Sequence, residues 1–347
     1  MSRYYKIAGC IHIHFPIKFF EKGIKLVAEN ANRAGLDFAI LTSHVPEKEN
    51  KYKEILNFNS YYGKTLIISG QETNDIRKKN HLIIVGEKEW YRKKENIQEI
   101  IYKVKNKNAF TIVAHPFGEH RLSLKKKNYE WENWENEFDC VEVWSLLFDW
   151  ATFTNPFNLP FRYFTFPDNL NGPDKRAVLM WDSISNKRKI PAIAGLDIHL
   201  LPPILRFFDI KKNFLYETTF KILRNHLFLK ENLSGNSLDD VKRIFECLKR
   251  GNLYFSNDYL KNSDGFYFGE ENGDFLMGDE GQFGKKIIIE TPFKGEIKLI
   301  KNGKVIVRKN DKFLEYFVEE KGNYRVEVYF NNKPWIFSNF LYFGSFC

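Results

Sequence analysis

Short apolar runs rich in β-branched residues alternate with segments of helical spacing between about residues 5 and 200. The clearest helical segment, Phe20–Ala34, gathers its apolar residues on one stripe and is followed by Gly35, and a weaker stripe covers Ile97–Val104. The apolar runs predict strands at 7–13, 38–41, 66–68, 82–85, 110–114, 140–143 and 192–196. Short strands alternating with helices predict an α/β fold with a mainly parallel sheet.

Side chains that bind metals stand at or beside these apolar runs. The run 7–13 contains His12 and is followed by His14, and two residues on one face of a strand point the same way. In parallel β/α barrels the chemistry gathers at the C-terminal ends of the strands. The pattern therefore favours chemistry at this edge, where residues of the types that bind metals stand at His12, His14, His44, Glu72, His81, His115, Asp197 and His199, with the carboxylate of Glu142 in an apolar setting nearby.

Each of these residues also has an ordinary structural interpretation. A single histidine on an apolar strand is more often a packing residue. His, Asp or Glu after a strand is often a capping or turn residue. The ordered set, with two i, i+2 pairs, favours ligands. We interpret His120 and His226 as ordinary loop or helix-surface residues, and Cys140 as a small buried hydrophobe.

These motifs together resemble the PHP (polymerase and histidinol phosphatase) family of metallohydrolases. The resemblance rests on His12-Ile13-His14, Thr42-Ser43-His44, Gly70-Gln71-Glu72, His81, Ala114-His115-Pro116, Glu142-Val143 and Gly195-Leu196-Asp197-Ile198-His199, in the family's order. It implies a distorted (β/α)7 barrel with two or three divalent metal ions at its C-terminal rim.

The resemblance also implies roles for single residues. A first metal is held by His12, His14, Glu72 and Asp197, and Glu72 bridges to a second metal bound by His81 and His115. His44 and His199 belong to a third position and assist proton transfer or substrate binding. Imidazole and carboxylate ligands suit Zn, Mn or Fe, and a metal-bridged hydroxide is the expected nucleophile. Glu142 is expected either to orient a ligand histidine or to bind a metal directly.

Two departures from the family pattern concern the third metal. Phe15–Phe20 replaces the polar and acidic residues that usually follow the first histidine pair, and Ser43 stands where members commonly have Asp. We therefore expect two metal ions, or three with a weakly held third.

Residues 118–190 are expected to form a long insertion over the mouth of the site. Its aromatic residues predict either a lid over a ring-bearing substrate or a small core of its own. Arg121 and the run Lys125–Lys127 are candidates for anion binding, although a lysine run is usually a solvated loop.

The chain from Asp209 to Asn257 is expected to be mainly helical. Its clearest helix starts at Ser237, with Asp240 completing a capping box, and 252–257 is a probable strand. Residues 274–347 alternate like short strands, and Asn302-Gly303 indicates a hairpin. We expect a barrel domain at 1–273 and a small β-sandwich at 274–347, an arrangement that resembles stand-alone PHP proteins with a C-terminal β-domain.

Composition adds limits to this picture. The chain carries a formal net charge of +9 with four scattered cysteines, and no apolar stretch reaches the length of a membrane span. We expect a cytoplasmic protein without disulfides and without a membrane partner. The charge suits a small anionic ester substrate, whereas nucleic acid is not favoured.

The predicted function is metal-dependent hydrolysis of a small phosphoester. Hydrolysis of a carboxylic or carbamic ester and single-strand nuclease activity are alternatives on the same metals. A non-catalytic metal-binding protein with an interaction surface is the alternative of another class, because the acidic residue after the first histidine pair is missing.

Overall fold

The computed structural model describes residues 4–15, 17, 20–44, 55–56, 58–91, 95–105, 107, 109–121, 127–199 and 215–344. The strands are β1 (Tyr5–Ile13), β2 (Phe38–Leu41), β3 (Asn59–Tyr62), β4 (Thr65–Asn74), β5 (His81–Val85), β6 (Phe110–Val113), β7 (Glu119–His120), β8 (Lys127–Asn128), β9 (Cys140–Ser145), β10 (Ala192–Gly195), β11 (Leu223–Leu229), β12 (Leu253–Asn257), β13 (Tyr267–Glu270), β14 (Lys286–Lys301), β15 (Lys304–Phe317), β16 (Gly322–Phe330), β17 (Lys333–Ser338) and β18 (Leu341–Phe343). The helices are α1 (Phe20–Ala34), α2 (Ile97–Lys105), α3 (Leu146–Ala151), α4 (Leu159–Phe164), α5 (Lys175–Ser185), α7 (Tyr216–Thr219) and α8 (Ser237–Arg250).

The mixed α/β character is confirmed, and four of the six pairings along the series β1, β2, β4, β5, β6, β9 and β10 are parallel, with β5 as the exception. Parallel pairing joins β1, β2 and β4, and again β6, β9 and β10, whereas β5 runs antiparallel to both β4 and β6. The reason is the connection from β4 to β5, which is a short turn through Lys78 in the left-handed region rather than a helix. A strand that returns through a tight turn must pair antiparallel.

The two ends of this strand series are joined beside the candidate site. The backbone N–H of Leu196 donates to Ile11 O, and that of His14 donates to Ile198 O, so the end of β1 lies against the residues that follow β10. The side-chain amide of Asn225 donates to Ala194 O and accepts from Ala194 N along the same edge of β10. Side-chain and backbone hydrogen bonds therefore hold the first and last strands of the series together.

Asn225 belongs to β11, a strand that the sequence analysis assigned to a helical region. The prediction of a mainly helical stretch from Asp209 to Asn257 is wrong there, because β11 pairs antiparallel with β1 and with β12. Its polar residues hid the strand pattern, although Asn225 is fully buried. Residues 209–214 of the same stretch lie outside the described residues.

The predicted helices α1 and α2 are confirmed, and so is α8, but the capping box at its start is wrong. The N-cap is Asn236, whose side chain accepts from the N–H groups of Leu238 and Asp239. Asp240 is buried and instead accepts hydrogen bonds from Ser234, Gly235 and Tyr61. The helix ends at Gly251 in the left-handed conformation, as the sequence predicts.

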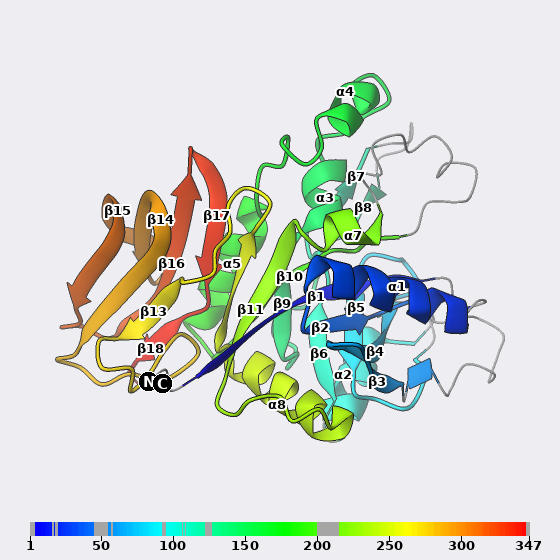
Figure 1. The fold of residues 1–347 in the computed structure, drawn as a ribbon, viewed down its shortest axis with the longest axis horizontal. Helices are drawn as coiled ribbons and strands as arrows, with labels where there is room; N and C mark the ends of the chain where they lie inside the picture. Colours follow the sequence, from blue (N-terminus) through cyan, green and yellow to red (C-terminus); the bar gives the residue numbers. More distant parts are fainter. Residues whose placement is uncertain are drawn as a thin grey trace.

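The expected insertion 118–190 is divided by β9, which pairs with β6 and β10 inside the sheet. Its aromatic residues divide between buried and exposed positions, and the lid stays a prediction. Trp131, Trp144 and Trp150 are buried in the main core, whereas Phe157 and Phe161 on and before α4 are largely exposed. Figure 1 shows α4 projecting from the body of the molecule.

The C-terminal strands form an antiparallel group around a core of their own. The hairpin at Asn302-Gly303 is confirmed, with both residues at positive φ between β14 and β15. Strand β13, which precedes residue 274, pairs with β14, and β17 pairs with β12, so the group continues the N-terminal sheet. Figure 1 shows these strands side by side at one end of the molecule, with α5 next to the place where they meet the N-terminal sheet.

Two further sequence expectations concern cysteines and membranes. Cys10, Cys140 and Cys247 are free and buried, and Cys140 lies in an apolar core as expected, while Cys347 is outside the described residues. Within the described ranges no helix is long and apolar enough to cross a membrane.

Candidate metal centre

The eight predicted ligands come together at one end of the strand series. They come from six places: the end of β1, the third residue after β2, the interior of β4, the start of β5, the residues after β6 and the residues after β10. Only His44 and His199 have substantial exposure, with 36% and 48% of their side chains accessible. The other six residues, His12, His14, Glu72, His81, His115 and Asp197, are buried.

Glu72 lies at the centre of this cluster. Its Oε1 is 2.6 Å from His81 Nδ1 and 3.3 Å from His115 Nε2. Its Oε2 faces a different set of imidazoles, at 3.3 Å from His14 Nε2 and 3.2 Å from His44 Nδ1. One carboxylate thus presents each of its oxygens to a separate group of histidines.

Asp197 is the second carboxylate of the cluster. Its Oδ1 is 3.2 Å from His14 Nε2 and 3.5 Å from His12 Nε2, and its Oδ2 is 3.8 Å from His115 Nε2. Together these contacts define three overlapping groups in which the potential ligand atoms lie within 4.8 Å of one another. The groups are His12, His14, Glu72 and Asp197; Glu72, His81 and His115; and His14, His44 and His199.

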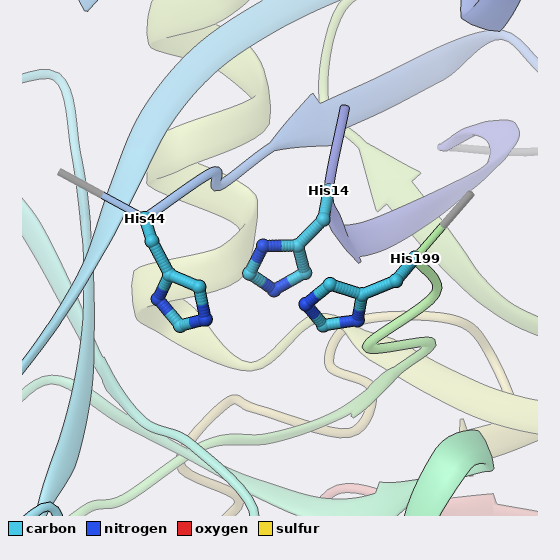
Figure 2. Close-up of side chains that lie close together, drawn as sticks. All are labelled: His14, His44 and His199. Atoms are coloured by element: carbon cyan, nitrogen blue, oxygen red, sulfur yellow. The ribbon is translucent and has the colours of Figure 1, made fainter. Parts of the chain in front are cut away.

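Figure 2 shows the third group, whose three imidazoles converge from separate segments of the chain. The rings of His14 and His199 stack with centroids 3.9 Å apart, and the ring of His44 is 4.7 Å from that of His14. The backbone hydrogen bond from His14 N to Ile198 O holds the segments of His14 and His199 together. This group has no carboxylate of its own.

The chemistry of the buried atoms fits divalent metal ions. His12 Nε2, His14 Nε2 and Glu72 Oε2 are buried, face one another, and have no hydrogen-bond partner among the described residues. Buried polar atoms are almost always satisfied in native proteins, so such a group needs a cation or an equivalent partner. Mixed imidazole and carboxylate donors suit Zn, Mn or Fe.

The backbone supports the same interpretation. His12, His115 and Asp197 have φ values of 64°, 28° and 49°, in a region that non-glycine residues seldom occupy. The other positive-φ residues that are not glycine, Lys78, Asn302, Asn331 and Asn332, lie outside this cluster. Backbone strain of this kind concentrates at functional sites, where the surrounding structure maintains it.

The ionisation of the two carboxylates follows from their surroundings. Burial raises the pKa of Asp197, but His12 and His14 outweigh burial and hold it below its usual value. Burial likewise opposes ionisation of Glu72, and His81 and His44 lower its pKa well below the ordinary range. Partial burial of the ring, reinforced by His14, lowers the pKa of His199 to about 4. The site therefore combines ionised carboxylates with a neutral imidazole at its exposed side.

Glu142 lies beside the cluster, where it orients His12. Its Oε2 is 2.6 Å from His12 Nδ1, which leaves His12 Nε2 directed at Glu72 and Asp197. Gly195 makes room for this carboxylate, because a Cβ there would lie 2.4 Å from Glu142 Cδ. The orienting role of Glu142 stays a prediction, and this hydrogen bond is the contact that such a role requires.

The remaining predicted site residues have other contacts. The Ser43 hydroxyl accepts from Phe15 N and donates to Phe15 O, so it ties β2 to the chain after β1. Arg121 is half exposed and pairs with Glu119. Phe15 is buried in the core, while Pro16, Lys18, Phe19, Lys125 and Lys126 lie outside the described residues.

The two histidines assigned to loops or helix surfaces lie in strands, so that interpretation is wrong. His120 ends the short strand β7. His226 is buried in β11, where its Nε2 lies 3.1 Å from Asp258 Oδ2 and 3.2 Å from Ser263 Oγ. Because the acid and the hydroxyl share one ring nitrogen, this trio lacks the relay of a Ser-His-Asp nucleophile. Sequence reasoning missed it because its members are far apart in the chain.

Comparison with known proteins adds little beyond the site itself. No protein-family model matches the chain, and no curated protein sequence is detectably similar to it. A solved two-domain protein from Bacteroides vulgatus, containing a predicted PHP-like metal-dependent phosphoesterase, has a TM-score of 0.47 and 15% identity over 98% of this chain and 96% of its own. That likeness is too weak to carry an argument, so the case for function rests on the buried cluster.

Proposed function

We propose that this protein is a metal-dependent phosphoesterase with two divalent ions, Zn, Mn or Fe, and a weaker third site. The observation that carries the proposal is Glu72, a buried carboxylate whose two oxygens face separate sets of histidines. Two ions held by one carboxylate would activate water and stabilise the departing oxygen of the ester. The hydrolysis adds one water, breaks the ester P–O bond and releases an alcohol and inorganic phosphate.

The buried residues of the cluster would bind the metal ions, and the accessible ones would contact the substrate. His12, His14 and Asp197 would hold the first ion, His81 and His115 the second, and Glu72 both. His44 and His199 are the accessible members, so they meet the substrate and exchange protons at their ring nitrogens. All eight residues fall in the proposed domain 1–273. The proposed domain 274–347 packs against that domain and stabilises it. A cytoplasmic location and a small anionic ester substrate belong to the same proposal.

The first test is metal analysis of the purified protein combined with turnover of 4-nitrophenyl phosphate under Mn, Zn and Fe. Glu72→Gln keeps the side-chain shape but removes the shared charge, so we expect loss of bound metal and at least a 100-fold fall in kcat/KM, roughly the effect of losing an electrostatic catalytic group. The matched control is Glu132→Gln, an accessible glutamate that pairs with Arg77.

The outcomes separate the competing functions. Two or more ions per chain with metal-dependent turnover support the proposal. Full turnover by Glu72→Gln would contradict it. Bound metal without phosphate-ester turnover would point to a carboxylic or carbamic ester, or to a non-catalytic metal-binding protein.

A further inference from the structure

A cavity of about 390 Å³ opens beside the metal centre. Its buried end is formed by His115, a proposed metal ligand, and Glu142, which orients His12. Its outer end is formed by Phe153 and Arg176, which are both about half exposed. The cavity therefore extends from solvent to His115 and Glu142 at the edge of the proposed reacting centre, and its volume suits a small organic group.

The walls of the cavity are mainly apolar. Phe148 forms one wall, with its ring centroid 4.5 Å from that of His115, and Val143 and Ala177 add aliphatic surface. Gly118 allows this arrangement, because a Cβ there would lie 2.8 Å from the Phe148 ring. An aromatic ring can pack against Phe148 while an adjoining ester group reaches His115.

The charges around the cavity disfavour a second anionic group. Arg176 is engaged by Asp174, at 2.7 Å, and by Glu119, at 3.4 Å. The buried carboxyl of Asp149 accepts hydrogen bonds from the N–H groups of Asn171 and Gly172. It therefore fixes the position of these two lining residues. The lining contains three carboxyl groups, Glu142, Asp149 and Asp174, against the two cations Lys175 and Arg176.

We infer that this cavity receives the leaving group of the substrate, and that this group is uncharged and carries a ring. The inference rests on the proposed phosphoesterase function and makes it more specific. The preferred substrate class is a phosphate monoester of a ring-bearing alcohol. The buried hydroxyl of Ser145, which has no hydrogen-bond partner in the part of the chain that the structure describes, also lines the cavity and offers one polar contact to such a group.

Benzyl phosphate and ethyl phosphate provide the test, because both release an alkyl alcohol and only one carries a ring. We expect kcat/KM to favour benzyl phosphate by about tenfold or more. Ala177→Leu fills part of the cavity, so it should lower kcat/KM for benzyl phosphate by about tenfold and change that for ethyl phosphate by less than about twofold. Leu179→Phe, on the exposed side of the same helix α5, is the matched control and should change neither.

A binding measurement separates this inference from the proposed function. Saturation-transfer NMR with benzyl alcohol on metal-free protein needs no turnover. We expect transfer from the wild type and from Leu179→Phe, and its loss in Ala177→Leu, with thermal unfolding confirming that each variant is folded. Absence of transfer in the wild type, or equal transfer in Ala177→Leu, would overturn the cavity assignment. Absence of ester hydrolysis with intact alcohol binding would overturn only the catalytic function.

Discussion

Glu142 shows how one residue outside the proposed ligand set can control the centre. Its carboxylate accepts from His12 Nδ1 and so fixes which ring nitrogen faces the metal position. The carboxylate also increases the basicity of the imidazole. Both effects depend on the charge of Glu142 and on the space that Gly195 leaves for it.

Glu142→Gln should therefore weaken metal binding without removing a ligand. Because loss of such an orienting partner typically costs 10- to 100-fold in affinity, we expect a decrease of about that size for the first ion. Competition with a chromophoric chelator measures the affinity directly. The control Glu135→Gln changes a largely exposed glutamate that pairs with Lys187, and it should have no effect. Equal affinities in wild type and Glu142→Gln would show that His12 does not need this partner.

At the scale of elements, α8 is fastened to the rest of the fold through Asp240. This side chain accepts from the backbone N–H groups of Ser234 and Gly235 before the helix, from Tyr61 on β3, and from Arg243 one turn later. Burial raises the pKa of Asp240, but the hydrogen bonds from Ser234 and Tyr61 outweigh it and lower the pKa to about 2.

The lowered pKa makes the contribution of Asp240 to stability dependent on pH. Because the folded-state pKa lies below the unfolded value, the contribution is complete above about pH 4 and is lost as the pH falls towards 2. Asp240→Asn should lower the free energy of unfolding by about 2 kcal/mol at pH 7. Urea unfolding of both proteins at several pH values should show this difference shrinking below pH 4, whereas the exposed control Asp239→Asn should show little difference at any pH. A difference independent of pH would contradict the assignment.

The sequence predicted the extent of α8 but not the residue that caps its N-terminus. Helical spacing and the glycine at its end are local signals, so the limits Ser237 and Gly251 were accessible. The contact of Asp240 with Tyr61 on β3 depends on a strand from elsewhere in the chain, whereas the cap at Asn236 is a local contact that the capping-box prediction missed.

At the scale of the whole molecule, the C-terminal strands hold the segments that form the site. The side chain of Asn339 bonds both Ala192 N and Ala192 O at the start of β10, the strand that leads to Asp197 and His199. The buried guanidinium of Arg325 on β16 pairs with both carboxylate oxygens of Asp182 on α5, at 2.6 and 2.8 Å. The C-terminal group is thus part of the framework around the centre and the cavity.

Arg325→Met should accordingly destabilise the whole protein. Removing one partner of a buried ion pair leaves an uncompensated charge at Asp182, so we expect a loss of about 3 kcal/mol in the free energy of unfolding. Urea unfolding followed by tryptophan fluorescence measures it. The control Arg33→Met breaks an accessible pair with Glu217 and should cost less than about 1 kcal/mol. A loss for Arg325→Met no larger than this control would mean that the two parts are not coupled through the buried pair.

The sequence by itself determined the chemical nature of the centre. Histidines and carboxylates at the ends of apolar runs identify six segments that can meet, because strand ends gather at one edge of a sheet. The helices α1 and α2 and the hairpin at Asn302-Gly303 were also accessible, since their signals lie within a few residues.

The tertiary structure alone decided how these segments are joined. The antiparallel direction of β5, the strand β11, and the amides of Asn225 and Asn339 along β10 all depend on contacts between distant residues. The same is true of the pairing of Glu142 with His12 and of the cavity beside Phe148. Periodicity reports which face of an element is buried, whereas the partner across that face is fixed only when the whole chain packs.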